Sequence, residues 1–342
     1  MTFLQAEIES QPEVVARLLE REAPRVATIV SQLPAFQYVL MAARGTSDHA
    51  ATYAKYSWAA LAGYPVALAT PSLHTLYGAP PRMDGALVVG VSQSGQSPDI
   101  VSVLEEGRRQ GRPTLAITND GSSPLAAAAD HVIELHAGLE RSVAATKTYT
   151  AQLTVMALLA AYLRGSGQDE LGRLPAALAA ALEAARPVVE RRAERYRYME
   201  QCVIVGRGYN YATAFETALK LKELTYIMAT AYSSADFRHG PIATVTEGLP
   251  VILIMPSGAA LDDMLELSRE LKERGAELVS ISDADSAHTL ATTAVPLGAA
   301  VPEWLSPITA IVPGQLLSLY LALAKGYDPD APRGLQKVTR TF

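Results

Sequence analysis

Cysteine is almost absent from the sequence, since Cys202 is the only one in 342 residues. A single cysteine cannot form a disulfide within the chain, which favours a reducing compartment, and we expect a cytoplasmic protein. Cys202 begins the apolar run CVIVG. We therefore interpret it as a small core side chain and not as a nucleophile.

Basic clusters and metal-binding spacings are also lacking. The formal net charge is -6 and no basic patch occurs, so we expect neither nucleic acid nor an anionic membrane as partner. The six histidines show no HxxxH or HxH spacing, which predicts no metal site and no cofactor. No uninterrupted apolar run reaches the roughly 20 residues of a membrane span. The first 20 residues lack the basic start of a signal peptide.

The sequence does contain a long internal repeat. Three matched pairs are each separated by 163 residues: Gly45 and Gly208, Gly95 and Gly258, and Val132 and Val295. Each copy has the same order of apolar runs, glycine turns and amphipathic stretches. We infer a duplicated domain.

The apolar runs in both copies are typical of parallel sheets. Residues 88–91 and 252–254 are continuously apolar, which indicates strands buried on both faces. The amphipathic stretches that follow them each end just before a glycine, as helices do. The predicted fold class is α/β, with two tandem domains, each a three-layer αβα, flavodoxin- or Rossmann-like parallel sheet.

The domain boundaries follow from these patterns. We expect N-terminal helices over 1–34 packed on the first domain, a first domain over 35–165, a helical connector over 166–200, a second domain over 201–325 and a C-terminal tail over 326–342. The connector should have one helix up to about Pro187 and another after it. The proline-rich tail has a composition that is usually frayed.

The octapeptide SQSGQSPD, residues 92–99, follows a predicted buried strand and leads into a helix. Gly95 permits a tight turn, and Pro98 and Asp99 suit the first helical turn. Free N–H groups there attract an anion, and four side chains add donors: Ser92, Gln93, Ser94 and Ser97. The alternative is ordinary helix capping. The second copy reads MPSGAA and has lost most of these donors, which favours one phosphate site, in the first copy.

Two further stretches also begin helices. Thr46 and Ser47 follow the apolar strand YVLMAA, and Thr146 precedes a helix predicted over 148–163. Their hydroxyls can cap these helices or contact a ligand, and the pattern leaves both interpretations open.

A helix predicted over 211–228 carries Glu216, Lys220 and Glu223 on one face. The stripe is either a solvated ion pair or a carboxylate held ionised beside an ammonium, as a general base requires. His239 precedes Gly240-Pro241, which no helix can continue through. It is either a turn histidine or a proton shuttle of fixed orientation.

Seven ordered motifs carry a family resemblance: RGTSDHA, SQSGQSPD, SVAATKTY, GRGYNYA, ETALKLKE, SSADFRHGP and PRGLQKVT. They cover nearly the whole chain. The sequence resembles the sugar isomerase (SIS) domain family, and within it the isomerase half of glucosamine-6-phosphate synthase and the stand-alone SIS-type glucosamine-6-phosphate deaminases.

The resemblance implies roles for particular residues. The substrate-binding set is Thr46, Ser47, Ser92, Gln93, Ser94, Ser97, Val143 and Ala145. Glu223 is implied as the base that moves a proton between C1 and C2, supported by Lys220. His239 is implied to open the sugar ring and, in a homodimer, to serve the neighbouring subunit. Lys337 is implied to fold over the site, which makes the tail an ordered lid.

Two departures favour a deaminase. Ala145 stands where the synthase pattern has serine. Gln96 and Ser97 stand where that pattern has Glu and Thr, which is a milder change. Thr2 follows Met1, so we expect no glutaminase with a cysteine nucleophile. The expected reaction converts glucosamine 6-phosphate and water to fructose 6-phosphate and ammonia. Alternatives are another phosphosugar aldose–ketose isomerase, a fructosamine-6-phosphate deglycase, or a regulator that binds a sugar phosphate without turnover.

Overall fold

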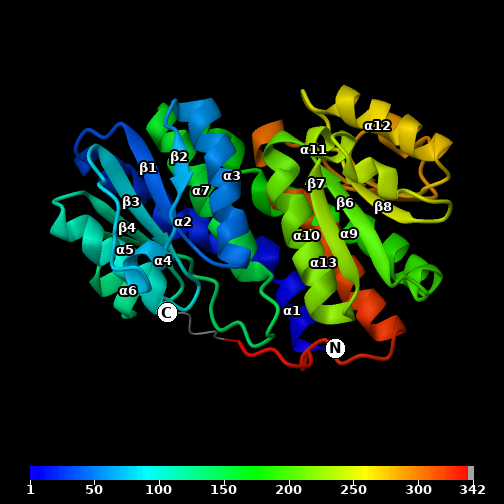
Figure 1. Ribbon diagram of the computed structural model, residues 1–342, viewed down its shortest axis with the longest axis horizontal. Helices are drawn as coiled ribbons and strands as arrows, with labels where there is room; N and C mark the ends of the chain where they lie inside the picture. The colour runs from blue at the N-terminus through cyan, green and yellow to red at the C-terminus, as the bar shows by residue number, and fades with distance from the viewer. Residues whose placement is uncertain (338–342) are drawn as a thin grey trace. The chain divides into compact units, whose positions relative to one another are not determined.

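Two parallel five-stranded sheets organise the chain in a computed structural model that describes residues 1–337 (Figure 1). Each sheet belongs to its own compact unit. The first-sheet unit contains residues 13–140 and 147–172 and the end of the chain from Gln336. The second-sheet unit contains residues 1–12, 141–146 and 173–335. The chain therefore passes between the units several times.

The first sheet has the strand order β2-β1-β3-β4-β5, and every pairing is parallel. Its strands are β1 (Tyr38–Ala42), β2 (Val66–Leu68), β3 (Ala86–Val91), β4 (Thr114–Thr118) and β5 (His131–Glu134). All six residues of β3 are buried, as its continuous apolar run predicts.

Helices cover both faces of this sheet. They are α2 (Gln11–Gln32), α3 (Thr46–Ala62), α4 (Ser72–Thr75), α5 (Pro98–Arg109), α6 (Pro124–Ala127), α7 (Lys147–Arg164) and α8 (Gln168–Leu171). One hydrophobic cluster joins β3 to α5 through Val88, Val103 and Leu104. Helices α3 and α7 pack against each other, and α3 also contacts β1 and β2 (Figure 1).

The second sheet has the order β10-β9-β8-β6-β7 and is also entirely parallel. Its strands are β6 (Gln201–Gly206), β7 (Met228–Ser233), β8 (Pro250–Ile254), β9 (Glu277–Ser282) and β10 (Thr293–Pro296). A cluster that includes Val251, Leu267 and Leu271 joins this sheet to helix α12.

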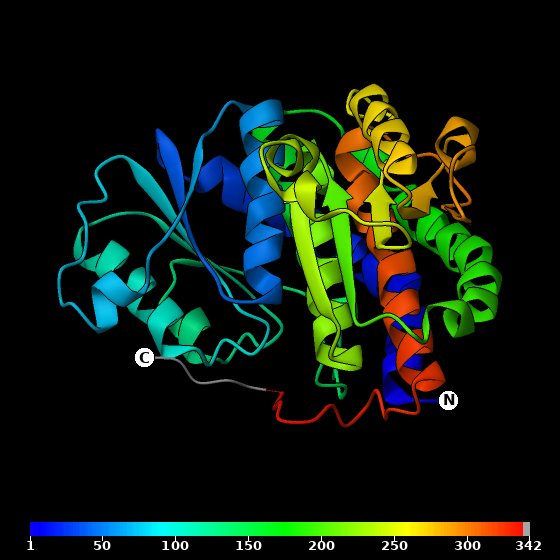
Figure 2. The same ribbon diagram turned by 45° about the vertical axis from the view of Figure 1, so that its right-hand side comes forward.

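The helices of the second-sheet unit again lie on both faces. The α-helices are α1 (Phe3–Glu9), α9 (Leu174–Ala193), α10 (Tyr211–Thr225), α11 (Ser234–Arg238), α12 (Leu261–Glu273) and α13 (Ser306–Ala324). Short 3-10 turns are η1 (Glu194–Tyr196), η2 (Gly208–Asn210), η3 (Pro241–Thr244), η4 (Asp285–His288) and η5 (Glu303–Leu305). Helix α13 packs between its neighbours α9 and α10 (Figure 2).

The two sheets confirm the predicted fold class and the duplication. Strand β1 corresponds to β6, β2 to β7, β3 to β8, β4 to β9 and β5 to β10, and these pairs give both sheets the same strand order. The offset of 163 residues found in the sequence aligns the first residues of every pair of strands to within one residue. Each copy is a sheet between helices, as expected.

Three local expectations are wrong. Helix α1 packs against α13 in the second-sheet unit and not on the first sheet. The connector helix α9 continues through Pro187 to Ala193, because proline costs one backbone hydrogen bond that the buried side of the helix outweighs. The helix that starts at Tyr211 ends at Thr225, where Tyr226 adopts a left-handed conformation with φ of 60°.

The tail as far as Leu335 is held by specific contacts, so the expectation of fraying is wrong for it. The Asp330 carboxylate accepts hydrogen bonds from the N–H groups of Phe3 and Leu4, at 2.7 and 2.9 Å, at the start of α1. The Arg333 guanidinium lies 3.9 Å from the ring centroid of Tyr226, and its backbone N–H donates to the Tyr226 hydroxyl. The final residues 338–342, which complete the tail and the motif PRGLQKVT, lie outside the described residues.

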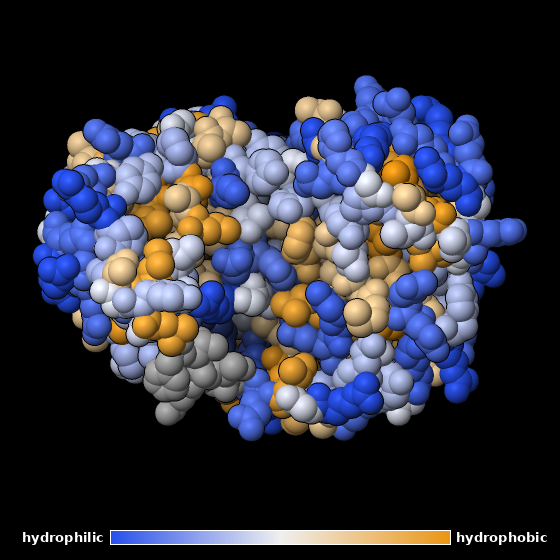
Figure 3. Space-filling view, in the orientation of Figure 1, coloured by the Kyte–Doolittle hydropathy of each residue, from blue (hydrophilic) through white to orange (hydrophobic). Residues whose placement is uncertain are grey.

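Residues Glu303–Ala324 form one helical stretch that is long and apolar enough to cross a membrane. Single polar residues interrupt its apolar residues along the whole length, so the stretch is not one uninterrupted apolar run. The stretch is 83% buried within the protein, as expected for a central core helix. On the face shown in Figure 3, hydrophobic side chains occur in separate groups among hydrophilic ones.

Candidate functional site

The loop between β3 and α5 contains the octapeptide at residues 92–99. Gly95 has φ of 62°, and a side chain there would collide with Ser123. Both the backbone conformation and the lack of space therefore require glycine. The Ser92 hydroxyl accepts from the Gly95 N–H at 3.2 Å, and the Ser94 hydroxyl accepts from the Gln96 N–H at 3.3 Å. These bonds fix a tight turn at the carboxyl end of β3, where ligands bind in parallel sheets.

Capping does not account for Ser97. It occupies the N-cap position of α5, but its side chain makes no capping hydrogen bond. Gln93, Ser94 and Ser97 are partly exposed, whereas Ser92 is buried. Three of the four predicted donor side chains therefore reach the surface at the N-terminus of α5.

The neighbouring β1–α3 loop is tied to the octapeptide by an ion pair. The Arg44 guanidinium lies 2.8 Å from the carboxylate of Asp99, which is fully buried. Helix α3 begins after Gly45, so neither Thr46 nor Ser47 caps it. Ser47 is buried and its hydroxyl accepts from the Gln152 side chain on α7 at 2.9 Å. The two predicted loops thus lie in one part of the first-sheet unit.

The equivalent loop in the second copy is occupied by the protein's own carboxylates. Glu303 accepts from the N–H groups of Ala259 and Ala260, at 2.8 and 3.3 Å. Asp283 accepts from the Ser257 N–H at 2.7 Å. A side chain at Gly258 would collide with Glu303. In residues 1–337 no carboxylate is bound to the corresponding N–H groups of Gln96 and Ser97 in the first copy, which supports the predicted asymmetry.

The predicted stripe on α10 is buried, so its interpretation as a solvated ion pair is wrong. Glu216 and Lys220 are fully buried, because α10 packs against α13 and against strands β6 and β7. The Lys220 ammonium lies 3.3 Å from the Glu216 carboxylate and 2.5 Å from that of Glu223. Glu223 keeps 21% of its side chain exposed. One ammonium therefore holds one buried and one accessible carboxylate.

The electrostatics of this group keep Lys220 charged. Burial alone would lower the pKa of Lys220, but the adjacent carboxylates of Glu216 and Glu223 outweigh it and hold the pKa above the ordinary lysine value. Three charged groups on two successive turns are tolerated because opposite charges alternate at hydrogen-bond distance. Of these, only Glu223 is accessible enough to meet a substrate.

His239 is exposed and follows the short helix α11, where Gly240 has φ of 140°. No hydrogen bond or ion pair joins His239 to the α10 triad within residues 1–337. The preceding Arg238 anchors the turn to α12 through ion pairs with Asp263 and Glu270, at 2.8 and 3.1 Å. The histidine is thus an exposed side chain on an anchored turn, and its use by a neighbouring subunit stays a prediction.

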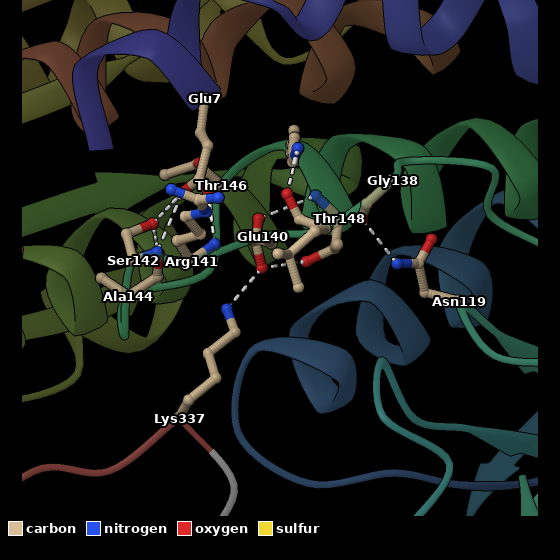
Figure 4. A network of polar contacts seen from close by, with 12 residues as sticks. Glu7, Asn119, Gly138, Glu140, Arg141, Ser142, Ala144, Thr146, Thr148 and Lys337 are labelled. Carbon is tan, nitrogen blue, oxygen red and sulfur yellow. Dashed lines mark hydrogen bonds and ion pairs between the residues drawn. The ribbon is translucent and has the colours of Figure 1, made fainter. Parts of the chain in front are cut away.

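The segment 141–146 belongs to the second-sheet unit, although the residues on both sides of it belong to the first. Its buried residues are Ser142, Ala144 and Thr146, so Val143 and Ala145, the predicted substrate contacts, point the other way and are partly exposed. Glu7 of α1 holds the segment by accepting from the Arg141 N–H at 2.5 Å and from the Ser142 hydroxyl (Figure 4).

Lys337 lies in the first-sheet unit, paired with Glu140 at 2.6 Å (Figure 4). The Glu140 side chain is completely buried and also accepts from the N–H and hydroxyl of Thr148, at 3.1 and 2.8 Å. Sequence reasoning missed both Glu7 and Glu140. The repeat offset was an available signal for Glu140, because it pairs this residue with Glu303.

The predicted residues thus form two groups. The octapeptide, Thr46, Ser47 and Lys337 belong to the first-sheet unit, and Glu216, Lys220, Glu223, His239 and the 141–146 segment belong to the second. Comparison with known proteins decides the family: the SIS domain model matches residues 37–162 and 197–325. The chain belongs to the SIS domain family.

Relatives extend this result. Glutamine–fructose-6-phosphate aminotransferase [isomerizing] of Thermococcus kodakarensis is 34% identical over 350 residues, which cover 98% of this chain and 57% of that protein. The C-terminal domain of glucosamine-fructose-6-phosphate aminotransferase from Francisella tularensis superposes with a TM-score of 0.85 at 27% identity, covering 96% and 98% of the two chains. Glucosamine-6-phosphate deaminase from Thermotoga maritima shares the fold, with a TM-score of 0.84 at 21% identity, covering 99% and 100%. This SIS chain spans just over half the length of the curated relatives it matches.

Proposed function

We propose that this SIS protein is a sugar-phosphate isomerase, and that its reaction converts glucosamine 6-phosphate and water to fructose 6-phosphate and ammonia. The observation that carries the proposal is the α10 triad, in which an accessible carboxylate lies 2.5 Å from a buried ammonium. Such a carboxylate can accept a proton from carbon, while the ammonium stabilises the negative charge that develops.

The repeat gives independent support, because each copy keeps a different half of the chemistry. At the triad positions the first copy has Tyr53, Ser57 and Ala60, and the Ser57 hydroxyl bonds only to the backbone of Tyr53. At the donor positions the second copy keeps one hydroxyl, that of Ser257, and Glu303 fills the loop. Reciprocal loss is expected if one copy binds the phosphate and the other transfers the proton.

In the proposed reaction each residue has one role. The N–H groups and side chains of residues 93–97 bind the phosphate, which fixes the sugar for an effectively intramolecular reaction. His239 donates a proton to the ring oxygen, and the ring opens. Glu223 takes the C2 proton and returns it to C1, and the resulting fructosimine is hydrolysed to the ketone and ammonia. Lys337 is assigned to the open-chain sugar.

The decisive experiment mixes the purified protein with glucosamine 6-phosphate and measures ammonia and fructose 6-phosphate. Glu223→Gln should keep phosphosugar binding but stop the incorporation of solvent deuterium at the sugar carbon. No ammonia from a folded protein would reject this substrate. Deuterium exchange that persists in Glu223→Gln would reject the assigned base.

Release of ammonia is the finer part of the proposal, and it is supported by Ala145, which stands where the synthase pattern has serine. A panel of fructosamine 6-phosphate, tagatose 6-phosphate and galactosamine 6-phosphate separates a deglycase or another isomerase from a deaminase. Tight binding of a phosphosugar with no turnover on any member of the panel would favour a regulator instead.

A further inference from the structure

Two buried carboxylates occupy equivalent positions in the repeat and are used differently. Glu140 and Glu303 are separated by 163 residues, the offset that relates the two copies. Each follows the last strand of its sheet and precedes a long core helix, α7 or α13. Glu303 binds the N–H groups of its own loop, at Ala259 and Ala260. Glu140 does not bind the corresponding N–H groups at Gln96 and Ser97.

The carboxylate of Glu140 is instead bound at the N-terminus of α7 (Figure 4). Its Oε1 accepts from the backbone N–H of Thr148 at 3.1 Å, and its Oε2 accepts from the Thr148 hydroxyl at 2.8 Å. Thr148 is the second residue of α7, so the helix terminus also attracts the negative charge. This arrangement explains how a fully buried carboxylate remains stable.

Lys337 also binds this carboxylate. The Lys337 ammonium lies 2.6 Å from Oε2 of Glu140, and a quarter of the Lys337 side chain is exposed. Glu140 and Lys337 depend on each other unequally. Glu140 would retain both Thr148 bonds without the lysine, whereas Lys337 would lose the charged hydrogen bond that holds its ammonium.

We propose that Glu140 is the positioning residue for Lys337. In the second copy the equivalent carboxylate, that of Glu303, binds the N–H groups of its own loop. In the first copy the Glu140 carboxylate binds the tail residue Lys337 instead. The glutamate is the same in both copies, and its different use leaves the loop of residues 92–99 open in the first copy and positions Lys337. The catalytic consequence rests on the proposed function, in which Lys337 acts on the open-chain sugar. The docking itself does not depend on that function.

Acylation of lysine side chains by an N-hydroxysuccinimide ester, read by mass spectrometry on the full chain, tests the docking directly. Glu140→Gln should raise the acylation rate of Lys337 about tenfold, because a charge-assisted bond protects the amine in the wild type. Lys325 is the internal reference, since its ammonium binds the carbonyl groups of Arg197 and Met199. Glu303→Gln is the matched control and should leave the Lys337 rate unchanged. Glu140→Asp, which keeps the charge, should restore most of the protection.

Turnover of glucosamine 6-phosphate gives the second readout. Glu140→Gln and Lys337→Met should lower kcat by similar factors with little change in KM, and the double variant should be no worse than either single one.

An unchanged Lys337 acylation rate in folded Glu140→Gln would overturn the proposal. If Glu140→Gln does not fold, Glu140→Asp takes its place. A Lys337 acylation rate above that of the wild type, together with a smaller loss of kcat on adding Lys337→Met than in the wild type, supports docking. An unchanged acylation rate and the same loss of kcat in both backgrounds overturn it. Increased acylation with no turnover by any variant or the wild type supports the docking and rejects the proposed function.

Discussion

The Glu303 carboxylate accepts a hydrogen bond from the Ala259 N–H at 2.8 Å, in the loop that corresponds to residues 92–99 of the first copy, where we propose that the phosphate binds. A carboxylate of the protein thus stands where an anionic ligand would bind in the other copy. Two loops of common origin show what such a turn requires: N–H groups that meet a negative charge, supplied either by the chain or by a ligand.

Removing that internal anion should destabilise the second-sheet unit. Glu303→Gln weakens the acceptor for two backbone N–H groups at 2.8 and 3.3 Å, and we expect a loss of about 1–3 kcal/mol in the free energy of unfolding, measured with urea. Glu266→Gln, at an exposed position on α12, is the matched control and should change stability by less than about 0.5 kcal/mol. Equal stability of the two variants would mean that the loop does not need its carboxylate.

Ser97→Ala should separate ligand binding from helix capping. Because the Ser97 side chain makes no capping hydrogen bond, its removal should cost less than about 0.5 kcal/mol in stability. Loss of a hydrogen bond to a phosphate should raise the Kd for the phosphosugar about tenfold. Isothermal titration with the phosphosugar and urea unfolding give the two values. A stability loss of 1 kcal/mol or more, with binding unchanged, would restore the capping interpretation.

The Cys202 thiol should be unreactive in the native protein. Burial raises the pKa of Cys202 to about 12, because the thiolate is disfavoured in apolar surroundings. At pH 8 only about one thiol in 10⁴ is then ionised, and the thiolate is the reactive form. Ellman's reagent should detect no thiol in the native chain and one after denaturation. Rapid native labelling would show that the β6 strand opens readily.

The strands were predictable because burial on both faces leaves continuous apolar runs, as in β3 and β8. The repeat offset then fixed the correspondence between the copies. The path of α1 was not predictable, because its attachment depends on Glu7, which binds a segment 134 residues away, and on Asp330 near the other end of the chain. No local pattern encodes such distant partners.

The candidate site was predicted only in part. The octapeptide and the α10 triad have recognisable spacing, but spacing alone could not show whether Glu216 and Lys220 were solvated. Their burial comes from the packing of α10 against β6, β7 and α13, and Gly314 of α13 leaves room for Thr217. The roles of Glu140 and Glu303 were not predicted either, because an isolated glutamate in a sequence does not indicate a function. Only a residue-by-residue alignment of the two copies shows that these two glutamates are equivalent.

The triad allows stability and catalysis to be separated. Lys220→Met leaves the fully buried Glu216 without its ammonium, and we expect a loss of about 3–5 kcal/mol in the free energy of unfolding. Because neighbouring carboxylates raise the pKa of Lys220, the wild-type pairing contributes stability throughout the neutral range and is lost only as the pH rises above the ordinary lysine value of about 10.4.

Replacing both buried partners should restore stability without restoring catalysis. Glu216→Gln together with Lys220→Met removes both charges, and this double variant should recover about 2 kcal/mol or more relative to Lys220→Met alone. It still lacks the ammonium beside Glu223, so deuterium exchange into the phosphosugar should remain as low as in the single variant. Urea unfolding and exchange measured on the same preparations test this. If stability and exchange recover together, the ammonium is needed for folding alone, and its assignment to charge stabilisation is wrong.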